Sequence, residues 1–104
     1  NLPDFDEFPK YGGRGVSEMA PDLQGSLEEL GEITLVLRYI AVDPDEYADF
    51  MTAIEKAGFT LQGKTYFKYS DTKTYEMALS YSEKEGRMRV FHRITYTKKE
   101  ENKQ

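Results

Sequence analysis

Apolar and polar residues alternate along residues 32–40, a pattern typical of a β-strand. The residues of one parity are all apolar: Ile33, Leu35, Leu37 and Tyr39. Val36 and Ile40, on the other parity, are apolar as well. We therefore expect this strand to be central in a sheet and partly covered on both faces.

The same alternation predicts three more strands, over residues 60–70, 74–81 and 87–96. In the first of these, the residues expected to share a face are Leu61, Thr65, Phe67 and Tyr69. In the last, Met88, Val90, His92, Ile94 and Tyr96 alternate with Arg87, Arg89, Phe91, Arg93 and Thr95. The connections are short enough for hairpins, so we expect an antiparallel meander.

Residues 44–57 have the pattern of an amphipathic helix. Asp43 suits the N-cap, Pro44 suits the first helical position, and Glu46 completes a capping box. The apolar stripe consists of Tyr47, Phe50, Met51, Ile54 and Ala57. Gly58 then permits a Schellman ending, which lets Phe59 turn back onto the helix.

These elements predict an α+β fold of order β-α-β-β-β, with one amphipathic helix on a four-stranded, mostly antiparallel sheet. We assign residues 31–97 to this domain, residues 1–30 to an irregular acidic arm or tether, and residues 98–104 to a charged, disordered tail. One helix covers only one face of such a sheet, so the other face meets water or a partner.

The arm is rich in proline and glycine, which excludes a long helix or strand. Large apolar residues are nevertheless scattered through it, among them Leu2, Phe5, Phe8, Tyr11, Val16 and Met19. A pure linker would not need them, so we expect an extended arm that partly packs on the domain, with a short helical turn at residues 26–30.

Composition narrows the function. The 104 residues suffice for one domain, and an aromatic content of 13% favours a packed core over disorder. The chain has no cysteine, which excludes disulfides and thiol chemistry. A net charge of -5 disfavours binding to nucleic acid, and no apolar run is long enough to span a membrane.

The segments GEITLVLRYI, VDPDEYADFMTAIEKAGF, YEMALSYS and RMRVFHRI together resemble a domain of uncharacterised function found in bacterial lipoproteins and other exported proteins. The resemblance spans residues 31–97 and is most specific around Tyr47 and the Ala57-Gly58-Phe59 ending. It implies an extracytoplasmic setting in the cell envelope, with a membrane tether that is not present in this chain. It implies no catalytic residues and no cofactor.

His92 is the only histidine. A general base needs a hydroxyl or carboxylate partner and a metal ligand needs companions, and no such set can be identified around it. Its parity places it with Val90 and Ile94, which favours a hydrogen-bonded structural role over catalysis.

Other polar groups also have structural explanations. Asp43 and Asp45 are spaced like calcium ligands, but helix capping accounts for both. Asp4, Asp6 and Glu7 could attract calcium or form a solvated acidic tether. The stretch Gly12-Gly13-Arg14-Gly15 lacks the spacing of a phosphate loop and is interpreted as a flexible turn.

Two sets of residues remain candidates for binding. One is a possible stacking platform, for which core and rim packing is the favoured explanation: Tyr66, Tyr69, Tyr75, Tyr81 and Tyr96. The other, here named the arginine strip, is the candidate partner-binding set: Arg87, Arg89, Phe91 and Arg93. Alternation puts the strip on one sheet face, where it could grip carboxylates, contact the acidic arm, or simply pair with cross-strand acids such as Glu76.

We therefore expect a non-enzymatic binding or accessory domain without a cofactor or metal. Its protein or peptide partner would bind a sheet face or edge. The alternative is a self-associating structural domain, for instance a homodimer, that uses a sheet edge or the N-terminal arm. A third class, an enzyme with an unusual carboxylate or tyrosine site, has no recognisable constellation to support it.

Overall fold

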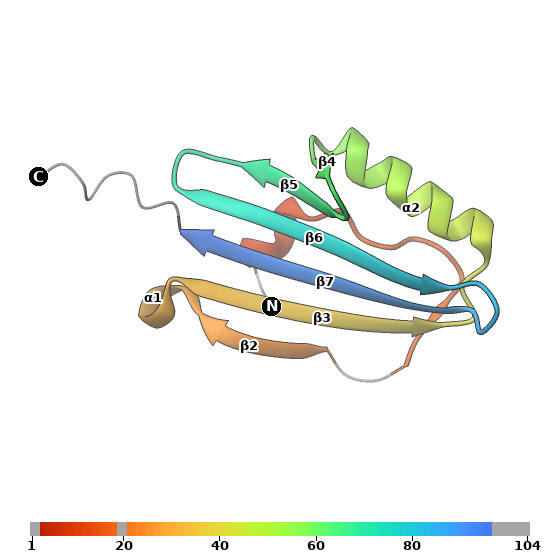
Figure 1. The fold of residues 1–104 in the computed structure, drawn as a ribbon. Coiled ribbons are helices and arrows are strands. Elements are labelled where there is room, and N and C mark those ends of the chain that lie inside the picture. Colours follow the sequence, from red (N-terminus) through yellow and green to blue (C-terminus); the bar gives the residue numbers. More distant parts are fainter. Residues whose placement is uncertain (1–2, 19–20, 97–104) are drawn as a thin grey trace, which may run out of the picture.

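The computed structural model describes residues 3–18 and 21–96 (Figure 1). The elements, in chain order, are η1 (Pro3–Glu7), β1 (Val16–Ser17), β2 (Asp22–Ser26), α1 (Leu27–Leu30), β3 (Glu32–Ile40), α2 (Pro44–Lys56), β4 (Thr60–Gln62), β5 (Thr65–Tyr69), β6 (Lys73–Ser82) and β7 (Arg87–Tyr96). The α+β class and the largely antiparallel sheet are confirmed. The count of four strands is wrong, because seven strands form one sheet within the described residues.

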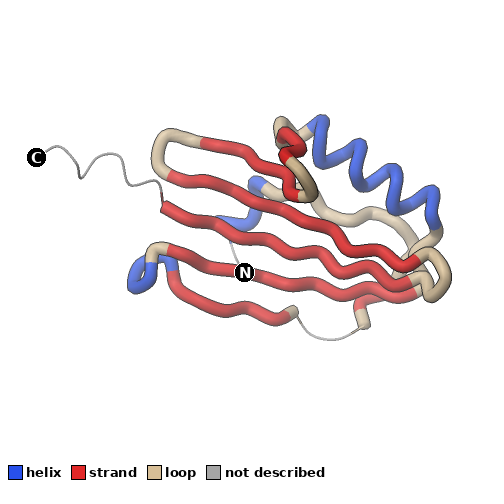
Figure 2. Tube along the Cα trace, viewed as in Figure 1, coloured by secondary structure: helices blue, strands red, loops and turns tan. Residues whose placement is uncertain are grey.

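The sheet order is β1-β3-β7-β6-β5-β4. Strand β2 also pairs with β3, on the same edge as β1: β1 pairs with residues 39–40 and β2 with residues 32–36. The meander of β5, β6 and β7 is as predicted, and β3 lies antiparallel to β7 with Leu35 opposite His92. Figure 2 shows α2 behind one end of the sheet rather than along its whole length. A helix of 13 residues, about 20 Å long, therefore leaves part of that face for other segments to cover.

The predicted strand over residues 60–70 is in fact a hairpin of β4 and β5. Gln62 pairs with Thr65, so Gly63 and Lys64 form a two-residue turn, and Gly63 has a positive φ of 66° that suits glycine. For the same reason the prediction that Leu61 shares a face with Phe67 and Tyr69 was wrong, because Leu61 pairs with Tyr66. Thr65, Phe67 and Tyr69 do share a face, as predicted, and Tyr66 is buried on the core side.

Helix α2 begins and ends nearly as its sequence predicts. The Asp43 N–H donates to the Glu46 carboxylate at 3.3 Å, as expected in a capping box. At the other end the Phe59 N–H donates to the Ile54 carbonyl and the Gly58 N–H to the Glu55 carbonyl, which is the Schellman pattern. The helix ends at Lys56, one residue before the predicted end, and buries Phe50 and Ile54 against the sheet.

The N-terminal segment is far more ordered than an irregular arm. Ser26 caps the predicted helical turn, now α1, and strands β1 and β2 join the sheet. We use the name arm below for the stretch that crosses the helix side of the sheet, residues 3–15. Its rings Phe5 and Phe8 are buried in the main core. The predictions for Leu2 and Met19, and for the tail 98–104, fall outside the described residues.

The two faces of the sheet differ in what covers them. The core face carries Leu35, Tyr75, Met77, Met88, Val90, His92 and Ile94, and it lies under α2 and the arm. The opposite face, here named the open face, carries the other parity of β3, β5, β6 and β7. In the described part of the chain, no helix is long and apolar enough to cross a membrane.

Phe8 tests whether the arm belongs to the core. Its side chain is 3% exposed, with ring centroids 5.7 Å from Phe59, 5.6 Å from Tyr75 and 4.6 Å from His92. Phe8→Ala should lower the free energy of unfolding by about 3–5 kcal/mol, as large core truncations do. Leu30→Ala, at a side chain 72% exposed, should change it by less than about 0.5 kcal/mol. Urea unfolding would measure both, and equal effects would contradict a core role for the arm.

Candidate functional site

In the described structure, neither α2 nor the arm lies over the open face (Figure 1). The register aligns its side chains in rows across the strands, because the pairings are regular from β3 through β7 to β6. One row contains Thr34, Arg93 and Glu76, the next contains Val36, Phe91 and Ala78, and a third contains Arg38, Arg89 and Ser80. The arginine strip therefore lies on one face, as predicted, and runs along the middle of it.

Arg93 is held within the sheet by acidic neighbours. Its guanidinium donates to both carboxylate oxygens of Glu76 at 3.0 and 3.3 Å and lies 3.8 Å from Glu32. It also lies over the Phe91 ring, 5.6 Å from the centroid. The hydrogen bond and charge of Glu76 raise the Arg93 pKa above its usual value. Arg93 thus has the cross-strand partner that the sequence suggested. Because Glu76 neutralises its charge, its main effect on the face is to hold the Phe91 ring in place.

Arg87 and Arg89 are differently placed. Arg87 pairs with Glu18 at 3.2 Å and is 4.0 Å from Glu85 near the β6–β7 turn. Arg89 lies directly between Arg38 on β3 and Ser80 on β6, and the described residues give it no ion pair. Like charges opposite each other in a sheet are unfavourable, so Arg38 and Arg89 make a local concentration of positive charge.

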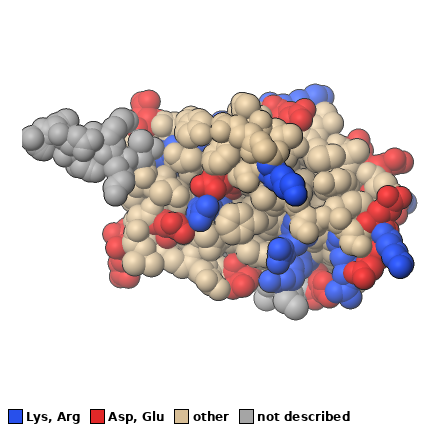
Figure 3. Space-filling view, viewed as in Figure 1, with Lys and Arg blue, Asp and Glu red and all other residues tan. Residues whose placement is uncertain are grey.

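This basic end of the open face also has a shallow cleft. Its volume is about 250 Å³, and its lining includes Glu18, Arg38, Ser80, Arg87 and Arg89. Figure 3 shows Lys and Arg side chains gathered toward the β6–β7 turn, with acidic side chains among them. Arg38 and Glu18 were not predicted as part of the site, because only the pairing of β3 with β7 and β1 brings them there.

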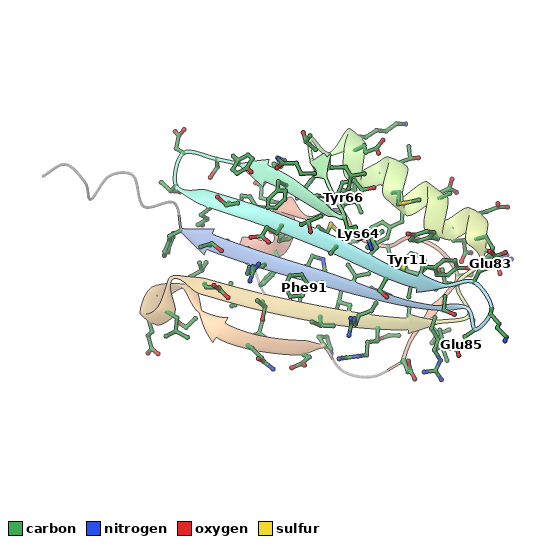
Figure 4. The ribbon with its side chains drawn as sticks, in the orientation of Figure 1. Tyr11, Lys64, Tyr66, Glu83, Glu85 and Phe91 are labelled. Carbon is green, nitrogen blue, oxygen red and sulfur yellow. The ribbon has the colours of Figure 1, made fainter. Side chains whose placement is uncertain are left out.

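Apolar groups lie at the centre of the open face and on β5. Figure 4 marks Phe91 about midway along β7, where Val36 and Ala78 are its cross-strand neighbours. On β5 the rings of Phe67 and Tyr69 are nearly parallel, with centroids 6.1 Å apart, and Tyr69 is 61% exposed. The face therefore combines a central apolar row with a basic end.

The arm does not cover the arginine strip. It packs on the core face instead, where Glu7 pairs with Lys68 at 3.2 Å. Its loop approaches the N-terminus of α2, because Arg14 binds both Asp43 and Glu46 at 3.2 and 3.3 Å and the Tyr11 hydroxyl donates to Glu46 at 2.7 Å. Residues 3–15 therefore do not contact the arginine strip, whereas Glu18, which lies farther along the predicted arm of residues 1–30, pairs with Arg87.

The same contacts explain the glycine-rich loop and the acidic helix start. Hydrogen bonds from the Arg14 N–H and the Tyr11 hydroxyl lower the pKa of Glu46 to about 2. The residues of Gly12–Gly15 therefore dock on the helix instead of forming a free turn. Among the described residues, no group of three or more His, Asp or Glu side chains is arranged to hold a metal ion.

The tyrosines do not form one platform. Tyr66 and Tyr75 are buried in the core, and Tyr81 stacks on Tyr47 with its hydroxyl donating to the Val42 carbonyl at 2.8 Å. Tyr69 and Tyr96 are exposed. Core and rim packing, the favoured interpretation, describes these positions.

His92 is a core residue, 4% exposed. Its Nδ1 lies 3.2 Å from the Leu35 carbonyl oxygen, which can only accept, so Nδ1 carries the proton. Burial lowers the His92 pKa to about 4, with a further small lowering from Lys10, while the bond to Leu35 opposes the shift. The ring is therefore neutral at pH 7, as expected for a structural histidine.

Comparison of the chain with protein-family models finds no match, and comparisons with curated proteins and with solved structures find none either. The resemblance to the lipoprotein-associated domain thus stays a hypothesis. Function has to be inferred from the faces of the sheet themselves.

The pH dependence of the free energy of unfolding tests whether His92 is buried in its neutral form. Its folded pKa lies below the unfolded value of 6.5, so the unfolded chain binds the extra proton more readily and stability is lost as pH falls from 6.5 toward 4. Between pH 7 and 4.5 the loss should be roughly 2 kcal/mol.

The control is His92→Asn, which keeps an N–H for Leu35 but does not titrate in this range. Urea unfolding at several pH values should show a flatter profile for this variant between pH 7 and 4.5, whatever its absolute stability. Parallel profiles for the two proteins would contradict burial of a neutral His92.

Proposed function

We propose that this domain is a non-enzymatic binding module that recruits a protein partner through its open face. The observation that carries the proposal is the uncovered sheet face, with an apolar row at its centre and a cleft lined by arginines at one end. Exposed apolar surface rimmed by charge is typical of interaction sites.

The charge arrangement specifies the kind of partner. The chain as a whole is acidic at -5, yet Arg38 and Arg89 lie side by side in the register. A partner carrying carboxylates could be bound bidentately by Arg89, for which the described residues show no ion pair. Phe91, steadied by Arg93, would supply the apolar contact at the centre. We therefore assign partner contact to Arg87, Arg89 and Phe91, and ordering of the site to Arg93.

An exported, membrane-tethered setting is the second part of the proposal. Its support is the resemblance of residues 31–97 to the lipoprotein-associated domain. In the native host, intact mass of the mature protein from fractionated cells should show a lipidated N-terminus in the membrane fraction. An unmodified protein in the cytosolic fraction would contradict this setting and leave the open-face proposal standing.

Self-association is the second candidate, and exposed sheet edges favour it. The outer edge of β2 has no neighbouring strand in the described structure, and Leu23 within this strand is 44% exposed. Such an edge could pair with a second copy. The arm is a weaker route, because Phe5 and Phe8 are already buried within the same chain.

A photo-crosslinking experiment tests both candidates. A photoreactive phenylalanine analogue replaces Phe91, and a control protein carries it at Thr52, on the exposed side of α2. With envelope extract from the host, the probe at position 91 should give a saturable adduct that position 52 does not give. Unlabelled wild-type protein should compete for that adduct, and Arg89→Glu should need at least about tenfold more protein to compete equally.

The outcomes separate the candidates. An adduct of the chain with itself would support self-association instead of a heterologous partner. Equal competition by Arg89→Glu, or equal adducts from positions 91 and 52, would overturn the open-face proposal.

A further inference from the structure

A second site lies on the other side of the sheet, in a cavity beneath the arm. Its volume is about 410 Å³, within the usual range for small-molecule pockets. Phe8 and Tyr11 of the arm form one wall, Phe50 of α2 another, and Leu37, Val90 and His92 of the sheet form the floor. Figure 4 labels Tyr11 in the region between the strands and α2.

The cavity exists because α2 and the arm together do not fill the core face. Leu37 and Tyr39 point to the core side, but they remain only partly buried although they pack on the core cluster. The rings of Tyr11 and Tyr39 lie 4.7 Å apart, and those of Tyr11 and Phe50 lie 5.9 Å apart. The space is thus bordered mainly by aromatic rings, which favour flat aromatic ligands.

His92 supplies a polar group at the floor of this cavity. Its Nδ1–H is used by Leu35, so Nε2 is a neutral acceptor, and the described residues give it no hydrogen-bond partner. Every fully enclosed side-chain nitrogen or oxygen of the described residues does have a partner. Nε2 is therefore accessible, and the cavity that His92 lines is where a ligand can reach it.

The charged lining residues exclude some ligand classes. Asp6 and Lys10, of opposite sign, are exposed and belong to the rim, so they give no net charge to attract an ion. The interior offers an acceptor but no charged group. A buried ion would lose its hydration without a counter-charge.

We propose that the cavity binds a small, uncharged aromatic molecule that carries one N–H or O–H donor, of the indole or phenol class. The donor bonds to His92 Nε2, and the ring packs among Phe8, Tyr11 and Phe50. This site is separate from the open face, because its residues have the opposite parity on β3 and β7.

Titration of the wild-type protein with indole, followed by amide NMR, is the first test. Saturable shifts are expected at Leu37, Phe50 and Val90, with none at Arg89 or Ser80. N-methylindole has nearly the same shape but lacks the donor, so it should bind about tenfold more weakly. No saturation up to the solubility limit of indole, or shifts confined to the open face, would overturn the site. Equal affinity for both probes would overturn the role of His92.

Filling the cavity provides the matched variant. Leu37→Trp places a larger side chain into it and should weaken indole binding at least about tenfold, whereas Leu30→Trp, at an exposed position, should leave binding unchanged. Leu37→Phe is the smaller substitution to use if the tryptophan variant does not fold. A folded Leu37 variant that binds indole as tightly as the wild type would place the ligand elsewhere. Loss of the crosslink at position 91 has no bearing on this result, so failure of either proposal is distinguishable.

Discussion

The stacking of Phe8 between the sheet and the segment that follows α2 joins the parts of this fold. Its ring meets Phe59 just after the helix and Tyr75 and His92 on the sheet. The contact exists because α2 is too short to cover the core face of a seven-stranded sheet alone. The arm supplies the missing apolar surface, and its return to the sheet edge gives β3 the neighbours β1 and β2. Cover on one face and exposure on the other both follow from this arrangement.

Elements whose signals are local could be predicted from the sequence. The caps of α2 and the parity of β3 and β7 are written in consecutive residues, and the structure confirms them. Strand β2 could not be found in this way, because Asp22–Ser26 is mostly polar and is a strand only through its pairing with β3. The β4–β5 hairpin was missed at Gly63, where an overlooked two-residue turn places Leu61 opposite Tyr66 and not on the face of Phe67. Alternation along a strand predicts which residues share a face, but non-local pairing decides which strands are neighbours.

The same limit applies to the candidate site. Alternation placed the arginine strip on one face, but only the register shows that Arg93 is neutralised by Glu76 and that Arg89 faces Arg38. These two arginines look alike in sequence and differ in chemistry. One is part of a bidentate pair that orders an aromatic ring, and the other sits beside a like charge. Arg89 is therefore the exposed arginine of the strip that the proposed partner would contact most directly.

The two faces of β7 also explain how the two proposed sites would coexist in so small a domain. Residues of one parity project to the open face, and residues of the other reach the cavity, so Phe91 and His92 are adjacent in sequence yet serve different surfaces. His92 is neutral because it is buried, and its one hydrogen bond to Leu35 fixes which nitrogen remains an acceptor. A histidine that looked inert in the sequence thereby offers a neutral acceptor at the cavity floor, to which the proposed ligand would donate. The closure of the cavity depends on the arm, which Arg14 and Tyr11 hold to Glu46 at the start of α2. The contact that holds the arm beside the cavity therefore involves none of the residues of the open face.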